Sequence, residues 1–596
     1  MAFDPRGRLT IAREDKGLLR MTLDADRRAV ERVETINSDL QECRGLLYAY
    51  DSLYANANNS KGMYRLRDTD GNDSLDEVRL LREFPGSTGH GRNDLTLGPD
   101  GLIYSIHGDA VDVPKNDVID YTSPFREARR GKNSKEGHLL RTDRDGKQWE
   151  LLAGGLRNPF GIAFNPLGDL FTYDADAEFD MGSPWYRPTR IDQLVSGDDF
   201  GWRGVTGKWP PYFPDHADNA SPTLDIGRGS PTAVVFGSGT RFPADYQRAL
   251  FILDWSYGRI LAVHLAPRGA GYRAWAETFL KGRPLNVTDI AVGPDGSLWI
   301  VTGGRKTQSA LYRIAYTGIA TPENPASPHE LACQKHAAAA RSLRIALEAR
   351  HRPIGEAAVE FAWPHLDSPD PMIRHAARIA IEHQPIQDWR ERAVREVSTT
   401  ARLTGLLALA RGGEKDNAAS IVRRLTRLDP TELTIGESSM LVQVYGLWLE
   451  QAPAEIAGQN AAILAQLSSL FPLSTTEPLS ISGVSSIASL NRDLVRLLAQ
   501  LGTPSLVEMV MQSLLTSNSQ EDRLQGLFVL RNMAAGWTPP MRRAYFIALN
   551  EANTFVGGEG MPKFLNQIRE QAIATPTDAE RESLADLLLP RTSADD

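Results

Sequence analysis

The sequence has few cysteines, no long apolar run and no excess of positive charge. Cys43 and Cys333 are its only cysteines, which excludes a disulfide framework and a cysteine-rich zinc site. No C-x-x-C-H motif occurs, so this chain attaches no covalent haem. No apolar stretch reaches the roughly 18 residues that a membrane span needs. The net charge of -9, from 66 basic and 75 acidic residues, leaves no basic footprint for nucleic acid.

The beginning of the chain also lacks a basic segment followed by an apolar one, so no secretory signal is visible. Taken alone, this indicates the cytoplasm. The composition is 41% hydrophobic and 24% charged over 596 residues, which is typical of a globular protein with two to four domains.

Glycine divides the chain into two parts. Residues 1–318 hold 36 of the 50 glycines, a pattern that predicts short strands joined by tight turns. The remainder is rich in Ala, Leu, Arg and Glu at helical spacing. We therefore expect an all-β domain over residues 1–318, a linker over 319–328 and an all-α domain over 329–596.

A degenerate turn-and-strand repeat recurs in the first part. Each copy places proline second and glycine fourth or close to it, before alternating apolar residues, as a tight turn into a half-buried strand requires. The four copies begin at Asp4-Pro5-Arg6-Gly7, Gly98-Pro99-Asp100-Gly101, Asn165-Pro166-Leu167-Gly168 and Gly293-Pro294-Asp295-Gly296. This spacing favours a six-bladed β-propeller, with a generic β-sandwich as the alternative.

The second part repeats a proline-broken turn followed by an amphipathic helix, as in Leu366 to Arg378. This pattern is typical of stacked HEAT-like helix pairs. We expect the arginines of these helices to lie on a solvated or inter-repeat face. The pattern contains no catalytic constellation, so packing or docking is its expected role.

An acidic loop is the first candidate site. Asp68, Asp70, Asn72 and Asp76 supply oxygen atoms at loop positions 1, 3, 5 and 9, which resembles a compact calcium loop without being a complete EF-hand. The alternative is a solvated acidic turn.

A second acidic group follows a predicted strand, where alternation would put four carboxylates on one face. Either a metal ion or nearby arginines would neutralise them. Its members are Asp174, Asp176, Glu178 and Asp180.

Two further residues lie in loops before predicted strands. His90 could take a proton from a substrate hydroxyl, because histidine titrates near neutrality. Arg157 could stabilise developing negative charge. The alternatives are an idle loop histidine and a surface salt bridge.

Three ordered segments resemble the soluble quinoprotein glucose/sorbosone dehydrogenases. They are His90 to Asp109, Arg157 to Phe164, and Ile191 to Trp202. The resemblance covers about residues 1–316 and implies a six-bladed propeller that oxidises a sugar or other alcohol with pyrroloquinoline quinone (PQQ) and calcium.

A closer resemblance, over nearly the whole chain, is to the PVC-type membrane-bound dehydrogenases, in which HEAT-like repeats follow the propeller. It rests on Gly45 to Tyr54, the loop at Asp68, Pro184 to Arg190, Asp254 to Arg259 and Arg531 to Pro539. It implies a periplasmic or otherwise extracytoplasmic protein, a cytochrome c electron acceptor, and a protein partner on the helical surface. The resemblance also implies that Met1 lies inside the first blade. It further implies that this chain lacks the haem domain that longer relatives carry.

The resemblance assigns roles residue by residue. His90 would be the base, Arg157 would polarise the quinone oxygen, and Asn158 would hold the cofactor. Where the family has a cofactor-binding Arg-x-Arg segment, this chain has Asn286-Val287-Thr288. Because PQQ carries three carboxylates, Arg259, Arg305 or Lys306 would have to supply the missing positive charges. The second histidine of the PVC-type group reads Asn93 here. The residues expected to contact substrate are Trp185, Arg187, Asp254 and Trp255.

Two functions therefore compete. One is a calcium-dependent quinoprotein-type dehydrogenase that acts at the propeller mouth. The other is a non-catalytic, calcium-stabilised propeller that binds carbohydrate and carries a helical platform for a partner. The shared strand-entry segments favour the first, and the missing cofactor cations favour the second.

Overall fold

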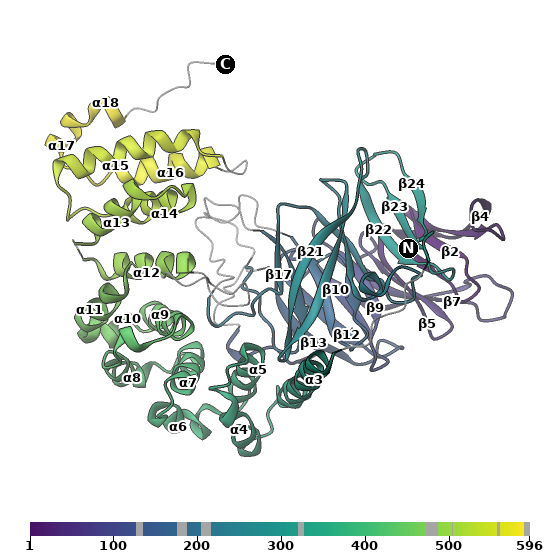
Figure 1. Ribbon diagram of the computed structural model, residues 1–596, viewed down its shortest axis with the longest axis horizontal. Coiled ribbons are helices and arrows are strands. Elements are labelled where there is room, and N and C mark those ends of the chain that lie inside the picture. The colour runs from purple at the N-terminus through teal and green to yellow at the C-terminus, as the bar shows by residue number, and fades with distance from the viewer. Residues whose placement is uncertain are drawn as a thin grey trace.

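The computed structural model describes residues 1–126, 135–175, 188–203, 216–319, 327–472, 487–503, 505–556 and 561–588. Six β-sheets follow one another along residues 1–314, and a curved array of helices follows them (Figure 1). The first strands of successive sheets lie side by side, from β1 against β5 to β18 against β22. The Met1 ammonium pairs with Asp289 and Phe3 packs edge-on to Trp299, which closes the ring of sheets. The predicted six-bladed propeller followed by a helical domain is confirmed.

The blades are built from neighbouring antiparallel strands, innermost strand first. Their strands are β1 (Ala2–Phe3), β2 (Leu9–Ala12), β3 (Lys16–Leu23) and β4 (Val30–Gln41); β5 (Cys43–Ala49), β6 (Ser52–Ala57), β7 (Gly62–Arg67) and β8 (Glu77–Glu83); β9 (Arg92–Leu97), β10 (Ile103–His107), β12 (Gly137–Thr142) and β13 (Trp149–Leu156), with β11 (Ile119–Asp120) parallel to β13; β14 (Ile162–Phe164), β15 (Leu170–Asp174), β16 (Thr189–Leu194) and β17 (Leu224–Gly227); β18 (Pro231–Phe236), β19 (Leu250–Asp254), β20 (Arg259–Arg268) and β21 (Gly271–Lys281); β22 (Val287–Val292), β23 (Leu298–Thr302) and β24 (Ala310–Ile314).

The repeated turn joins the first and second strands of four blades. In each copy the glycine has a φ of +76° to +83° and its N–H donates to the carbonyl three residues earlier, at 2.9–3.0 Å. A side chain at this φ would be strained, so glycine is required there. The copies end at Gly7, Gly101, Gly168 and Gly296.

Apolar side chains fill the space between neighbouring blades. Phe171 and Ile191 of the fourth blade pack with Phe236, Leu250 and Val263 of the fifth, and all five are buried. Alternation along each strand sends one set of side chains to each neighbouring blade, so the cores lie between the sheets.

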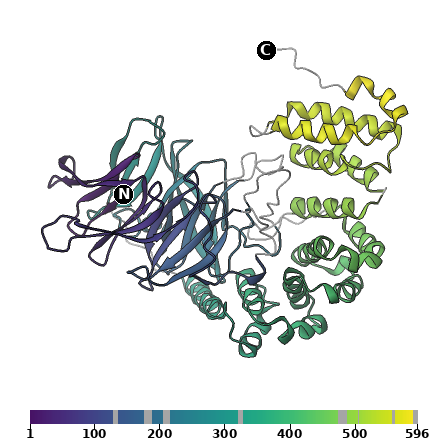
Figure 2. The same cartoon turned by 180° about the vertical axis from the view of Figure 1, so that it is seen from behind.

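The helical domain winds away from the propeller as a curved array, which the view from behind also shows (Figure 2). Each helix contacts others close to it in the sequence, and one continuous apolar core runs through the array. The HEAT assignment stays a prediction. The helices are α3 (Pro328–Glu348), α4 (Glu356–Ala362), α5 (Pro371–Glu382), α6 (Arg390–Arg395), α7 (Thr399–Gly412), α8 (Ala418–Leu425), α9 (Ile435–Gln451), α10 (Pro453–Ile456), α11 (Asn460–Leu470), α12 (Ile487–Leu501), α13 (Ser505–Thr516), α14 (Gln520–Leu530), α15 (Pro539–Glu551), α16 (Met561–Ile573), α17 (Asp578–Ser583) and α18 (Ala585–Leu588), and a short α2 (Ala244–Arg248) lies within the propeller.

Buried polar contacts join the two domains. Arg344 of α3 donates to Asp169 at 2.6 Å, and His351 bonds the Ser196 hydroxyl through Nδ1 at 3.0 Å. Arg378, which we expected on a solvated or inter-repeat face, is instead 2% exposed and donates to the Asp218 carbonyl at 2.7 Å. Among the helices described, none is long and apolar enough to cross a membrane.

Candidate active site

The strand order places the candidate residues at two different ends of the propeller. Blade-to-blade links and the links between second and third strands lie at one end, which we call the site face. The remaining hairpin links lie at the opposite face. The loops that carry His90, Arg157, Asn158, Trp255 and Arg305 all belong to the site face, as do the strand ends at Asp254 and Arg259. The acidic loop between β7 and β8 belongs to the opposite face.

His90 lies in a hydrogen-bonded chain of side chains from three separate segments. Its Nδ1–H donates to Asp109 Oδ1 at 2.7 Å, and the indole N–H of Trp202 donates to Asp109 Oδ2 at 2.8 Å. The side chain of His90 is 34% exposed and that of Asp109 is 14% exposed. Because Asp109 fixes the proton on Nδ1, the Nε2 atom of His90 is left as the proton acceptor.

The backbone holds His90 close to the neighbouring loop. The Ala110 N–H donates to the His90 carbonyl at 3.0 Å, and the Asp109 N–H donates to the Arg157 carbonyl at 2.8 Å. A Cβ atom at Gly108 would lie 2.7 Å from His90 Cβ and 2.7 Å from Asn158 Oδ1. Only glycine permits this approach, so position 108 fixes the spacing between these two side chains.

Arg157 is positioned by its own backbone and by Trp202. Its guanidinium lies over the Trp202 ring, 5.4 Å from the centroid. The N–H groups of Arg157 and Asn158 donate to the two oxygens of Asp174, at 2.9 and 2.8 Å, and the Ala175 N–H donates to the same carboxylate at 2.8 Å. Burial raises the pKa of Asp174, and these donors oppose the shift. Asp174 therefore orients the turn that carries Arg157.

Asn158 is held by Asn93, the position at which the resemblance led us to expect a second histidine. The Asn93 amide donates to Asn158 Oδ1 at 3.1 Å and to the Pro159 carbonyl at 2.8 Å. Arg44 donates to Asn93 Oδ1 at 3.1 Å and pairs with Glu42. Asn93 is fully buried, so its role in this site is to brace the Asn158 loop.

The fifth and sixth blades contribute a second group to the site face. Asp254 is fully buried and accepts from Arg259 Nε at 2.8 Å and from the Ser230 N–H at 2.9 Å. We predicted that Asp254 contacts substrate and that Arg259 contacts the cofactor. In the structure the two side chains form an ion pair with each other. Trp255 donates to the Gly303 carbonyl at 2.8 Å, and Arg305 lies 5.2 Å from its ring centroid.

The acidic loop brings three carboxylates together at the opposite face. Oxygens of Asp68, Asp70 and Asp76 all lie within 4.8 Å of one another. Asp68 also accepts from the Gly71 N–H at 2.7 Å and the Asp73 N–H at 2.8 Å, which shapes the turn. The Asn72 amide donates to Asp70 at 2.9 Å. A cation here would have no contact with His90.

Part of the predicted site lies outside the described residues. These positions are Asp176, Glu178 and Asp180 of the second acidic group, and Trp185 and Arg187 of the predicted substrate contacts. The partners of His90 were not assigned from the sequence, because Asp109 and Trp202 lie 19 and 112 positions after it. A signal existed only for Asp109, which follows the strand next to that of His90.

The fold and the site together define a six-bladed propeller with a His-Asp-Trp network on one face, joined to a helical array. Residues 1–303 match the family described as a domain of unknown function, DUF7133, and the chain belongs to that family. No curated protein matches the sequence.

Solved structures that are similar to this chain include three sugar dehydrogenases or proteins described as such. The PQQ-bound aldose sugar dehydrogenase of Streptomyces coelicolor is 17% identical, with 52% of this chain and 91% of that chain covered and a TM-score of 0.38. An oxidoreductase of Thermus thermophilus, provisionally a glucose dehydrogenase, is 20% identical, with 52% and 94% covered and a TM-score of 0.37. The PQQ domain of pyranose dehydrogenase from Coprinopsis cinerea is 15% identical, with 50% and 89% covered and a TM-score of 0.37.

Proposed function

We propose that this chain is an oxidoreductase that oxidises a hydroxyl group of a sugar or other alcohol at the site face. The observation that carries the proposal is the hydrogen bond from His90 Nδ1–H to Asp109, itself fixed by Trp202. In the neutral imidazole this arrangement leaves Nε2 as the nitrogen that can act as a general base. Arg157, which stacks on the same Trp202, supplies positive charge beside it.

The site face has a cation set suited to PQQ, an anionic quinone with three carboxylates. Arg157 lies on one side of this face, and Arg305 and Lys306 lie in the exposed loop of the sixth blade. Arg259 pairs with Asp254. Arg157, Arg305, Lys306 and the Asn158 amide are the residues that would hold the quinone. When bound, PQQ would accept the two electrons released by the alcohol carbon. His90 takes the hydroxyl proton, and Asp109 stabilises the resulting imidazolium.

Calcium is the second proposed ligand, at the acidic loop of the opposite face. Asp68, Asp70 and Asp76 supply carboxylate oxygens, as a hard cation prefers. Asp73 of the same loop is bound by Arg8 and Arg20, which join the second blade to the first. Calcium there would stabilise the propeller rather than take part in the chemistry.

We expect calcium to raise the melting temperature of the wild-type protein and to have no such effect on Asp70→Asn.

The extracytoplasmic location, a cytochrome c electron acceptor and a protein partner on the helical surface remain parts of this proposal. One observation favours an alternative function. On the site face, where a quinone cofactor needs cations, Arg259 is already paired with Asp254. In that case the propeller binds a carbohydrate without oxidising it, and the partly exposed Trp255 provides an aromatic surface.

The test combines a dye-reduction assay with a binding measurement. Purified protein is mixed with PQQ, CaCl2 and a panel of aldoses and alcohols, and PQQ binding is followed by its absorbance. His90→Ala should lower kcat by about 100-fold or more while PQQ binding persists, because only the base is lost. Arg157→Met should weaken PQQ binding itself.

The matched control is His264→Asn, on the outer part of the fifth blade, where His264 bonds Glu277 at 3.0 Å. It should leave the rate unchanged. Silence across the panel together with no absorbance change would refute the dehydrogenase. Sugar binding under those conditions would establish the alternative.

A further inference from the structure

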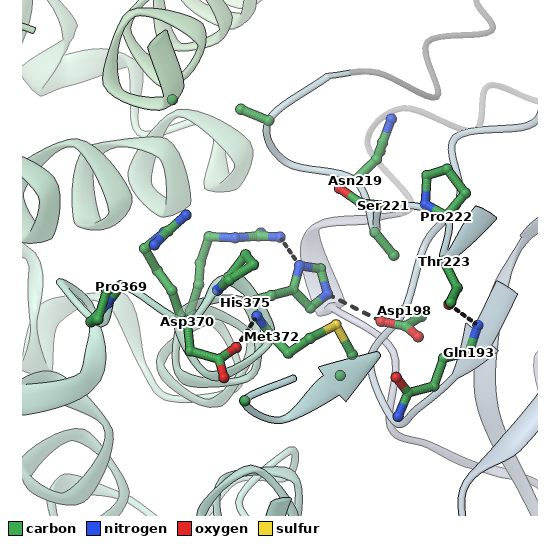
Figure 3. Close-up of a pocket in the computed structure, with 18 of the residues that line it drawn as sticks. Gln193, Asp198, Asn219, Ser221, Pro222, Thr223, Pro369, Asp370, Met372 and His375 are labelled. Carbon is green, nitrogen blue, oxygen red and sulfur yellow. Dashed lines mark hydrogen bonds and ion pairs between the residues drawn. The ribbon is translucent and has the colours of Figure 1, made fainter. Parts of the chain in front are cut away.

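A cavity of about 500 Å³ lies between the propeller and the helical domain (Figure 3). Its propeller side comes from β16, the segment after residue 216 and the turn between β20 and β21. Its helical side comes from α5, α7 and α9. Small-molecule sites occur preferentially at domain interfaces and have volumes of about 300–1,000 Å³. The cavity therefore has the place and the size of a ligand site.

Two buried polar side chains of the propeller line this cavity with hydrogen-bonding capacity unused. Gln193 is 5% exposed, and its amide nitrogen has no partner among the residues described. Asp198 is 2% exposed. Its Oδ2 accepts from the Val195 N–H at 2.9 Å. Among the residues described, Oδ1 has no hydrogen-bond partner, and His375 Nε2 lies 3.5 Å from it. Figure 3 shows Gln193 and Asp198 on one wall and His375 facing them. Leaving such groups unpaired is costly, which indicates that something else pairs with them.

Arg374 gives the opposite wall a positive charge. It donates to the Ser368 carbonyl at 2.5 Å, and it forms no ion pair with a carboxylate in the described part of the chain. Burial lowers the pKa of Arg374, and Asp370 and Glu437 only partly offset this effect. A partly buried arginine in this situation is stabilised by an anion.

Two other charged side chains of the cavity wall, Arg378 and Asp370, have partners of their own. Arg378 pairs with Glu382 at 2.5 Å and donates to His375 Nδ1 at 3.2 Å. Asp370 caps the N-terminus of α5 and accepts from the Ala270 N–H at 2.6 Å, which ties α5 to the propeller. Burial raises the pKa of Asp198 and lowers the pKa of His375, because it disfavours the charged form of each. Arg374 is thus a charged side chain of the helical wall that has no carboxylate within ion-pair distance among the residues described.

We propose that this interdomain cavity binds a small organic anion, a carboxylate or a phosphate on a molecule of about hexose size, with the anionic group at Arg374 and polar groups at Gln193 and Asp198. The site is distinct from the site face and does not rest on the proposed oxidation chemistry. The Gln193 amide nitrogen would donate to such a ligand, and Asp198 Oδ1 would bond one of its hydroxyl groups.

Isothermal titration calorimetry on the full chain tests the proposal with four probes: gluconate, glucose 6-phosphate, inorganic phosphate and glucose. We expect at least one of the two organic anions to bind, and glucose to bind at least about tenfold more weakly than that anion, because a charged hydrogen bond is worth that much. Gluconate alone would identify the source as a carboxylate, and glucose 6-phosphate with or without inorganic phosphate would identify a phosphate.

Two variants address the residues. Arg374→Met should weaken anion binding by about tenfold to a hundredfold. Gln193→Glu, nearly the same size, should weaken it by placing a negative charge against the ligand. Arg424→Met, an exposed arginine of α8, is the control and should change nothing. Circular dichroism and thermal unfolding establish that each variant is folded.

Three results would overturn the proposal. The first is failure of both organic anions to bind at millimolar concentration, where even a weak site is detectable. The second is equal binding of glucose and the anions, and the third is anion binding that survives both Arg374→Met and Gln193→Glu.

Discussion

The buried ion pair between Arg411 of α7 and Asp218 of the propeller is expected to be a main determinant of domain association. Both side chains are almost fully buried, at 1% and 0% exposed. Arg411 Nε also lies 3.1 Å from Glu382 Oε1, and Glu382 is itself completely buried. Arg411 therefore neutralises two carboxylates inside the interface.

Replacing Arg411 by Met keeps most of the side-chain volume and removes the charge. Removing one partner of a buried pair costs about 3–5 kcal/mol, because the other charge stays buried without it. Glu382 keeps Arg378 at 2.5 Å and also accepts from the Ser123 hydroxyl. We therefore expect the lower end of this range, about 3 kcal/mol. That is a large fraction of the roughly 5–15 kcal/mol by which a typical protein is stable.

The assay is equilibrium unfolding in urea, followed by tryptophan fluorescence and by far-ultraviolet circular dichroism. Arg411→Met should lower the transition midpoint and separate the unfolding of the two domains. Arg411→Met combined with Asp218→Asn should recover part of the loss, because the orphaned charge is gone. The control is Arg395→Met, whose guanidinium is 76% exposed and whose partner Glu391 is 66% exposed, so little change is expected. If Arg411→Met lowered the transition midpoint no more than Arg395→Met does, the interface would not depend on buried charge pairs.

Three other predictions concern titrating or buried groups. Burial and the charge of Asp289 raise the pKa of Asp94 from 3.8 to about 7. The contribution of Asp94 to the free energy of unfolding is therefore complete below pH 3.8 and is lost as the pH rises through 7. Asp94→Asn should raise the melting temperature at pH 8 and make it depend less on pH. Burial lowers the pKa of His351 from 6.5 to about 3. The neutral imidazole therefore makes its whole contribution to the free energy of unfolding above pH 6.5, and this contribution falls as the pH drops toward 3. In the same melting assay, the melting temperature of His351→Gln should change less between pH 6.5 and 4 than that of the wild type. Asp174→Asn should cost about 1–3 kcal/mol in urea unfolding, because an amide cannot accept from all three N–H donors, and an unchanged midpoint would refute this role.

The sequence predicted the propeller because its signal is local and repeated. A proline and a glycine at fixed positions of a turn, followed by alternating apolar residues, determine one hairpin without reference to the rest of the chain. The acidic loop was found for the same reason, since Asp68, Asp70 and Asp76 belong to one turn. Whether calcium binds there stays a prediction.

The contacts between distant segments were not predictable in this way. His90 was identified, but its partners Asp109 and Trp202 were not, and only Asp109 has a signal in the sequence, since it follows the strand next to that of His90. The pairing of Asp254 with Arg259 did have a local signal, because the two residues face each other across a hairpin with a four-residue turn. The resemblance directed attention to cofactor and substrate roles instead. Arg378 shows the same limit in the helical domain, where amphipathic spacing does not reveal that a propeller covers the polar face.

The stretch from Ser196 to Trp202 connects the helical domain with the candidate active site. It begins at Ser196, whose hydroxyl bonds His351, and passes Asp198, which faces His375 and the interdomain cavity. It then runs along the end of β13, where the Phe200 and Trp202 N–H groups donate to Gly154 and Gly155, and ends at the indole that holds Asp109.

Seven residues thus separate a contact with the helical domain from a contact with the candidate active site. A tilt of the helical array would reach the imidazole of His90 along this segment and then through the hydrogen bonds from Trp202 to Asp109 and from His90 to Asp109. If the cavity ligand favours one tilt, thermodynamic reciprocity requires that occupancy of the site face change the affinity for that ligand by the same factor. The helical domain would then report on the state of the propeller as well as extend its surface.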